Sequence, residues 1–143
     1  MEILFICTGN TCRSPIAEAL FRQAAREAGC GARATSAGMS VFAPAPAAVN
    51  AARAALELGA DLSGHVAKQV DSGLMAGAGA VYCMTAEHME LLIQMFPEHE
   101  QKIKLLDPGL DIDDPFGGSP ERYRRVAAQI KAAVDRTVGE LKT

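Results

Sequence analysis

Short apolar runs alternate along the chain with longer segments in which apolar residues recur every three or four positions. The runs are typical of strands buried on both faces of a parallel sheet, and the longer segments are typical of amphipathic helices. The predicted strands are 2–6, 32–36, 80–84 and 103–106, and the predicted helices are 15–28, 47–58, 85–96 and 120–141. This alternation predicts an α/β fold, a three-layer sandwich with a four-stranded parallel sheet between helices.

Capping residues agree with these helix boundaries. Ser14 is expected to cap the first helix, with Pro15 at its first position and Gly29 at its end. Thr85 is expected to cap the helix that follows the third strand. No repeat, low-complexity segment or linker divides the sequence, so residues 1–143 are expected to form a single domain.

The composition excludes several classes of protein. Hydrophobic residues make up 49% of the chain, which indicates a packed core. The apolar stretches are far shorter than the ~20 residues that span a bilayer, and the N-terminus does not resemble a signal peptide, so we expect a cytoplasmic protein without membrane contact. The net charge of −3 argues against a nucleic-acid partner, and the four cysteines lack the spacing of a metal site.

The sequence CTGNTCRSP, residues 7–15, directly follows the first predicted strand. Ligands of open α/β sheets bind beyond the carboxyl ends of the strands, often where a loop enters a helix. A loop of this length can turn its backbone N–H groups inward around an anion, and Arg13 would add a guanidinium that binds two phosphate oxygens. The residues predicted to bind the substrate phosphate here are Thr8, Gly9, Asn10, Thr11, Cys12 and Ser14.

Cys7 lies at the floor of this predicted pocket, where positive surroundings stabilise the thiolate of a cysteine. The Ser14 hydroxyl is expected to donate a hydrogen bond to the sulfur, and the Asn10 amide is expected to hold the loop in shape. Cys7 and Arg13 could otherwise be a buried residue at a strand end and a surface residue on a helix. Their position between a strand and a helix favours a nucleophile aimed at a bound phosphorus atom.

Four segments of the chain resemble the low-molecular-weight protein tyrosine phosphatase family: CTGNTCRSPIAEALF, TSAG at 35–38, VYCMT at 81–85 and DDPFGGSPERYRRV. The resemblance implies a flavodoxin-like sheet with the strand order 2-1-3-4. It also implies catalysis through a cysteinyl-phosphate, without metal or organic cofactor. In that family the positions matching Asn10, Ser36 and His65 brace the phosphate loop.

The reaction needs a general acid that protonates the leaving group. The loop 107–118 offers four aspartates that the pattern alone does not separate: Asp107, Asp111, Asp113 and Asp114. Asp114 is preferred because Phe116 is suited to a pocket wall and the following glycines allow the loop to bend over the site. The resemblance places the acid at this same position.

Thr11 bears on the choice of substrate. Tyrosine-directed relatives usually carry a bulkier aliphatic residue at this position, beside the mouth of the pocket. Threonine weakens an apolar wall for a phosphotyrosine ring and tolerates the polar, planar guanidinium of phosphoarginine. Together with DPFGGS, the loop resembles the protein arginine phosphatase branch of the family. This implies phosphorylated proteins as substrates, inorganic phosphate as the product, and an enzyme expected to be a monomer.

Other functions stay open at this point. A tyrosine phosphatase is the nearest alternative, and an arsenate reductase would need a resolving cysteine pair that Cys83 alone does not supply. A non-catalytic phosphate-binding or redox-sensing module would need only Cys7 and Cys12. In an enzyme, Cys12 is either the disulfide partner of an oxidised Cys7 or a small buried residue that shapes the loop. His88 is expected to be exposed.

Overall fold

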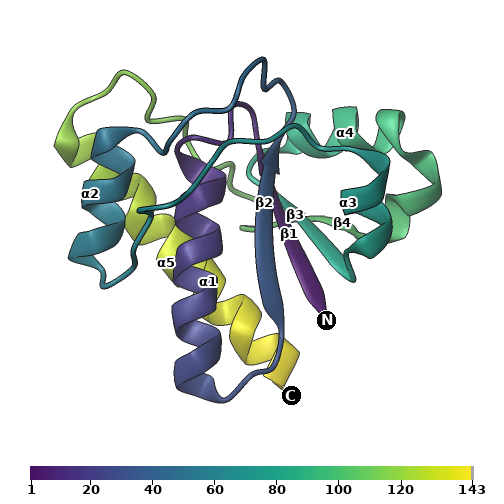
Figure 1. Cartoon of the computed structure of the whole chain (residues 1–143). Coiled ribbons are helices and arrows are strands. Elements are labelled where there is room, and N and C mark those ends of the chain that lie inside the picture. The colour runs from purple at the N-terminus through teal and green to yellow at the C-terminus, as the bar shows by residue number, and fades with distance from the viewer. Residues whose placement is uncertain (143) are drawn as a thin grey trace.

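The computed structural model describes residues 1–142, and its centre is a parallel sheet with helices on both faces (Figure 1). The strands are β1 (Glu2–Cys7), β2 (Arg33–Gly38), β3 (Ala80–Cys83) and β4 (Ile103–Leu105), in the order β2-β1-β3-β4. The helices are α1 (Arg13–Ala28), α2 (Val49–Glu57), α3 (Ser72–Gly77), α4 (Ala86–Met95) and α5 (Pro120–Lys142). The predicted three-layer α/β architecture and the strand order 2-1-3-4 are therefore confirmed.

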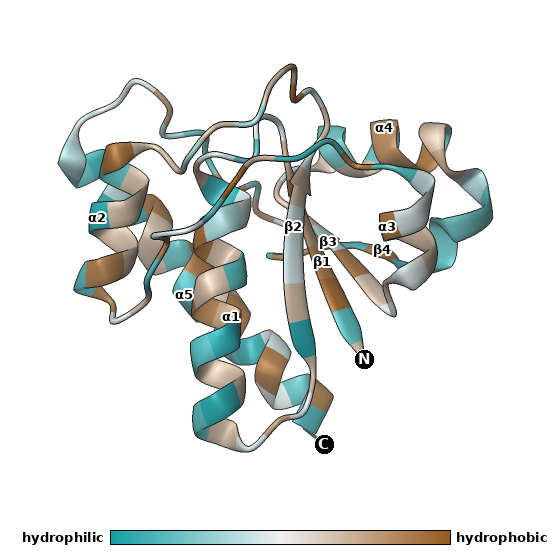
Figure 2. Cartoon of the chain, viewed as in Figure 1, coloured by the Kyte–Doolittle hydropathy of each residue, from teal (hydrophilic) through white to brown (hydrophobic). Residues whose placement is uncertain are grey.

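Alternate residues of β1 belong to two different cores. Ile3, Phe5 and Cys7 pack in the core that includes residues of α1, α2 and α5. Leu4 and Ile6 pack in the core that includes residues of α3 and α4. Figure 1 shows these two sets of helices on opposite sides of the sheet, and Figure 2 shows that the central strands β1 and β3 between them are largely hydrophobic. Cys7 therefore ends a central strand on the face covered by α1.

The prediction that Ser14 caps the first helix is wrong. Helix α1 begins at Arg13, and Cys12 occupies the cap position without a side-chain hydrogen bond. The Ser14 hydroxyl is instead bonded within the preceding loop, as described below, so it is not available to the helix terminus. The other boundaries agree with their signals, because Gly29 ends α1 in the left-handed conformation and Thr85 accepts a hydrogen bond from the His88 N–H.

Two further features complete the description of the chain. A 3-10 helix over Pro97–Lys102, which the sequence pattern did not predict, connects α4 to β4. Between residues 1 and 142, no helix combines the length and the apolar character needed to cross a bilayer.

Candidate active site

The loop over residues 8–12 joins β1 to α1 at the carboxyl end of the sheet, which is the upper edge in Figure 1. Cys7, the last residue of β1, is 2% exposed. The site therefore occupies the position at which open α/β sheets bind their ligands, with a buried thiol at its base.

Hydrogen bonds to the surrounding segments hold the loop carbonyl groups. The Cys7 carbonyl oxygen accepts from the Met39 N–H (2.9 Å), and the Thr8 carbonyl oxygen accepts from the Ser40 N–H (3.0 Å). The Asn10 carbonyl oxygen accepts from His65 Nε2–H (2.7 Å), and the Thr11 carbonyl oxygen accepts from the Ala48 N–H (2.9 Å). Within residues 1–142, no protein acceptor takes the backbone N–H of Gly9, Asn10 or Thr11. This arrangement is that of an anion-binding nest, in which the carbonyl groups bond to the surrounding protein and the N–H groups have no protein acceptors.

Asn10 is the structural centre of the loop. It is fully buried and adopts a φ of 56°, a left-handed conformation that asparagine tolerates better than most residues. Its side-chain amide donates to Ser14 Oγ at 2.7 Å and to Ser36 Oγ at 3.0 Å. Its Oδ1 accepts the Lys68 N–H at 3.0 Å. Asn10 therefore ties the loop to α1, to β2 and to the segment that follows α2.

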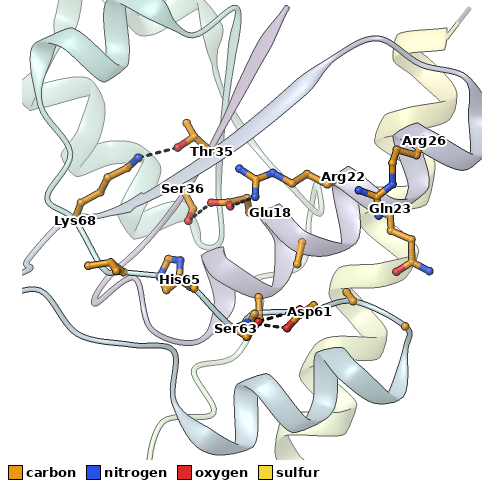
Figure 3. A pocket seen from close by; sticks show the side chains of 16 residues that line it. Glu18, Arg22, Gln23, Arg26, Thr35, Ser36, Asp61, Ser63, His65 and Lys68 are labelled. Atoms are coloured by element: carbon orange, nitrogen blue, oxygen red, sulfur yellow. Dashed lines mark hydrogen bonds and ion pairs between the residues drawn. The ribbon is translucent and has the colours of Figure 1, made fainter.

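Further polar side chains bond to Asn10 or to its partners, and Figure 3 shows Ser36, Glu18 and Arg22 among them. The Ser36 hydroxyl accepts from Asn10 and donates to Glu18 Oε1 at 2.7 Å. Glu18 Oε2 is in turn 2.9 Å from Arg22 Nη1. Ser36 and His65 thus contact Asn10 directly, whereas Glu18 acts one bond further away; these side chains border a hollow of about 570 Å³.

Cys7 receives two hydrogen-bond donors from Ser14. The Ser14 Oγ lies 2.9 Å from Cys7 Sγ, and the Ser14 backbone N–H points at the same sulfur from 3.4 Å. Because Ser14 Oγ accepts from the Asn10 amide, its own proton is available to the sulfur. Both donors from Ser14 therefore point at the same sulfur atom.

Arg13 is 4% exposed and joins the phosphate loop to the loop before α5. Its Nη1 donates to the Ile112 carbonyl oxygen at 2.9 Å, and its Nη2 lies 3.6 Å from Asp114 Oδ2. The buried guanidinium is therefore fixed in direction by the segment that carries the candidate acid.

The four aspartates of residues 107–118 have different partners, which the sequence pattern did not separate. Asp107 accepts from Gln129 and lies near Arg136, Asp111 Oδ1 accepts the Ala86 N–H, and Asp113 pairs with Arg122. Asp114 is the member of this set that faces Arg13, and its side chain remains 53% exposed. Its position beside the guanidinium and its access to solvent suit a group that exchanges protons with a bound substrate.

Phe116 follows Asp114 in a tight turn. Its backbone N–H donates to Asp114 Oδ1 at 3.1 Å, and its side chain is 72% exposed. Gly117 has a φ of 77°, and a Cβ at Gly118 would meet the Pro115 carbonyl oxygen at 2.9 Å, so this turn requires glycine at both positions. The turn holds the carboxylate and leaves the aromatic ring free to contact a substrate.

Thr11 and Cys12 form the part of the loop nearest α5. Thr11 is half-buried, and its Oγ1 lies 3.8 Å from Cys12 Sγ. The Cys12 sulfur is also 3.5 Å from the Tyr123 hydroxyl of α5. Burial is the main cause that raises the pKa of Cys12, so this thiol stays protonated at neutral pH. Cys7 and Cys12 are both free thiols.

His88 is buried, contrary to the prediction that it is exposed. It lies in the first turn of α4, and its Nε2 is 2.8 Å from Thr8 Oγ1. Burial, followed by the charge of Arg13, lowers the pKa of His88 to about 4. The Thr85 cap was the sequence signal that could have placed His88 near the site, because it puts His88 in the first turn of a helix that begins at the carboxyl edge of the sheet.

Comparison with known proteins gives a consistent result. Residues 2–143 match the family model "Low molecular weight phosphotyrosine protein phosphatase". The chain is 33% identical over 147 residues to a protein-arginine-phosphatase of Bacillus subtilis, covering 99% of this chain and 97% of the relative. It is 31% identical to the low molecular weight protein-tyrosine-phosphatase Etp of Escherichia coli, covering 92% of this chain and 88% of the relative.

Solved structures agree with the sequence comparison. The fold matches a crystal structure of a YwlE mutant from Bacillus subtilis with a TM-score of 0.95 and 33% identity, covering 100% of this chain and 99% of the other. It matches a mutant of the YwlE arginine phosphatase with a phosphorylated active-site serine equally well, with a TM-score of 0.95, 34% identity, and coverage of 100% and 97%. The chain is therefore a member of the low molecular weight phosphotyrosine protein phosphatase family.

Proposed function

We propose that the chain is a protein phosphatase that hydrolyses phosphoarginine through a cysteinyl-phosphate, with Cys7, Arg13 and Asp114 as its catalytic residues. The observation that carries the proposal is the phosphate loop itself, in which a buried thiol with two Ser14 donors lies in a nest beside a fixed guanidinium. The similarity to protein-arginine-phosphatases over 99% of the chain supports phosphoarginine as the substrate, and a tyrosine phosphatase is the alternative.

In the first step the Cys7 thiolate forms a sulfur–phosphorus bond while the bond from phosphorus to the guanidinium nitrogen breaks. The Asp114 carboxyl group gives its proton to the departing nitrogen, which leaves as part of an arginine side chain. The loop N–H groups and Arg13 stabilise the negative charge on the equatorial phosphate oxygens. A phosphate in the nest competes with Asp114 for the guanidinium, which frees the carboxyl group for the leaving atom.

In the second step the ionised Asp114 takes a proton from a water molecule as the water oxygen bonds to phosphorus. The sulfur–phosphorus bond breaks, inorganic phosphate leaves, and Cys7 returns to the thiolate. The Ser14 hydroxyl and N–H groups stabilise that thiolate as a leaving group, since both point at the sulfur.

Thr11 supports the choice of phosphoarginine. The Thr11 hydroxyl lies near Gly9, since a Cβ added at Gly9 would be 3.8 Å from Thr11 Oγ1. A hydroxyl at this place can pair with guanidinium N–H groups, whereas a larger aliphatic side chain would offer an apolar wall to a phenyl ring.

The proposal is tested by comparing matched phosphoarginine and phosphotyrosine peptides with the purified, reduced enzyme. We expect a higher kcat/KM for phosphoarginine, and we expect Thr11→Ile to shift the preference toward phosphotyrosine. Thr11→Ser, which keeps the hydroxyl, is the matched control and is expected to retain the preference. Equal or reversed preference in the wild type would contradict the substrate assignment and leave the phosphatase mechanism in place.

We also propose that Cys12 protects the nucleophile in a cytoplasmic enzyme. Peroxide oxidises the Cys7 thiolate to a sulfenic acid, and the Cys12 thiol then displaces water to form a disulfide, which cellular thiols reduce. Their positions at the two ends of one short loop, with Cys7 at the end of β1 and Cys12 directly before α1, support this role. The family match over 2–143 supports a single domain, and we propose that it acts on phosphorylated proteins as a monomer.

A further inference from the structure

The imidazole of His88 connects α4 to the phosphate loop across 80 positions of sequence. Its Nε2 lies 2.8 Å from Thr8 Oγ1, and the residue is 7% exposed. Thr8 immediately follows Cys7, so this hydrogen bond reaches the residue next to the proposed nucleophile.

Thr8 is held from two sides. Its carbonyl oxygen accepts the Ser40 N–H at 3.0 Å, from the segment after β2, and its hydroxyl meets His88 of α4. The next residue, Gly9, has no side chain with which to anchor the loop. Asn10 and its partners brace the second half of the loop, and the first half depends on the two bonds of Thr8.

The other ring nitrogen of His88 indicates that stability is not the reason for a histidine here. Its Nδ1 is buried and has no hydrogen-bond partner among residues 1–142. An unpartnered buried polar atom destabilises the folded state, and an apolar side chain of similar size would fill the space without that cost. The feature that a leucine could not supply is the Nε2 contact with Thr8.

The surrounding charges decide the form of the ring. Arg13, Asp111 and Asp114 are the charged groups that act on it, and burial together with Arg13 keeps the imidazole neutral. A neutral ring carries one N–H group. With the proton on Nε2, the ring donates to Thr8 Oγ1 and Nδ1 keeps a lone pair, whereas a proton on Nδ1 would bury a donor without an acceptor.

We propose that His88 is a positioning residue which, as a neutral imidazole protonated on Nε2, holds Thr8 and the first half of the phosphate loop in the geometry for attack on phosphorus. It acts through Thr8 and does not touch the reacting atoms. This inference rests on the proposed phosphatase function and adds a residue from α4 to its machinery.

The experiment compares His88→Leu and Thr8→Val, which each remove the bond, with His88→Gln and Thr8→Ser, which each keep a polar partner. Steady-state turnover of para-nitrophenyl phosphate is measured with the full, reduced chain, together with the melting temperature. We expect kcat to fall about tenfold in His88→Leu and Thr8→Val, with KM changed less than about twofold. We expect His88→Gln and Thr8→Ser to stay within about threefold of the wild type.

Two further readouts separate positioning from a structural role. The melting temperature of His88→Leu is expected to equal or exceed that of the wild type although its kcat is lower, because the unpartnered Nδ1 is removed. The double variant Thr8→Val/His88→Leu is expected to lose no more kcat than either single variant, because both remove the same bond. Nitrogen NMR of the wild type is expected to show a protonated Nε2 and an unprotonated Nδ1.

Full turnover in His88→Leu or Thr8→Val, losses that multiply in the double variant, or a ring protonated on Nδ1 would each overturn the proposal. If His88→Leu does not fold, the comparison of Thr8→Val with Thr8→Ser tests the same hydrogen bond, because Thr8 is exposed and its substitution is expected to leave the fold intact. A wild type without turnover contradicts the proposed function instead, and the NMR assignment then still decides the state of the ring.

Discussion

The phosphate loop and the loop before α5 face one another across Arg13, and they are built in opposite ways. Asn10 of the phosphate loop and Ser14 in the first turn of α1 are fully buried, and every polar atom of the Asn10 side chain is bonded. In the other loop the side chain of Asp114 is 53% exposed and Phe116 is 72% exposed. A group that stabilises developing charge must be fixed before the reaction, whereas a group that delivers a proton must remain accessible to substrate and water.

The largest expected effect tests the accessible loop. Asp114→Asn removes the proposed proton donor, and kcat is expected to fall about a hundredfold or more, which is typical of the loss of a general acid. The loss should be smaller for para-nitrophenyl phosphate than for phosphoarginine, because nitrophenolate leaves without a proton. The measurement is steady-state turnover of both substrates.

Asp113→Asn is the matched control for this prediction. Asp113 is the neighbouring residue and pairs with Arg122 on the surface rather than with Arg13. Its replacement is expected to change kcat by less than about threefold, since exposed ion pairs contribute little. An equal loss in both variants would mean that the shape of the loop, and not the acid, was tested.

The next effect tests the fixed loop. Asn10→Ala leaves the partners of a fully buried amide unsatisfied and places alanine at a φ of 56°. The free energy of unfolding in urea is expected to fall by about 3 kcal/mol, together with kcat. Asn10→Gly tolerates the backbone angle but still lacks the side-chain hydrogen bonds, so it should regain only part of the free energy of unfolding that Asn10→Ala loses. A free energy of unfolding equal to that of the wild type would assign the whole effect to the backbone angle.

A smaller effect concerns pH. Burial and Arg13 lower the pKa of His88 from 6.5 to about 4, so the unfolded chain binds a proton there at a higher pH than the folded chain does. Protonation of His88 in the unfolded chain does not affect stability above pH 6.5 and destabilises the folded state increasingly as the pH falls toward about 4. Between pH 7 and pH 5.5 the wild type should lose about 1 kcal/mol more than His88→Leu in urea unfolding. Parallel curves for the two proteins would contradict this.

The smallest effect concerns the exposed aromatic ring. Phe116→Ala removes a side chain that is 72% exposed, so the free energy of unfolding is expected to change by less than about 0.5 kcal/mol. If the ring packs against the guanidinium of the substrate, KM for a phosphoarginine peptide should rise about threefold. Phe42→Ala changes another ring, 98% exposed on the loop after β2, and provides a comparison for non-specific loss of apolar surface.

Much of this molecule follows from local signals in its sequence. The four apolar runs predict the strands, the periodic segments predict the long helices, and Thr85 and Gly29 mark helix ends that the structure confirms. The phosphate loop is equally local, because Cys7, Arg13 and Ser14 come from one short segment between a strand and a helix. Ser14 shows the limit of this approach, because a residue with the character of a cap is bonded to Cys7 and Asn10 instead.

The sequence by itself determined the α/β class, and it predicted the candidate nucleophile and the group of four candidate acids. The tertiary structure decided what depends on contacts between distant segments. It separated Asp114 from the other aspartates by their partners, supported Asn10 through Lys68 and the Ser36–Glu18 pair, and buried His88 against Thr8. The physical reason is that helical and strand periodicity report which face of an element is buried, whereas a hydrogen bond across 80 positions depends on how the finished layers meet.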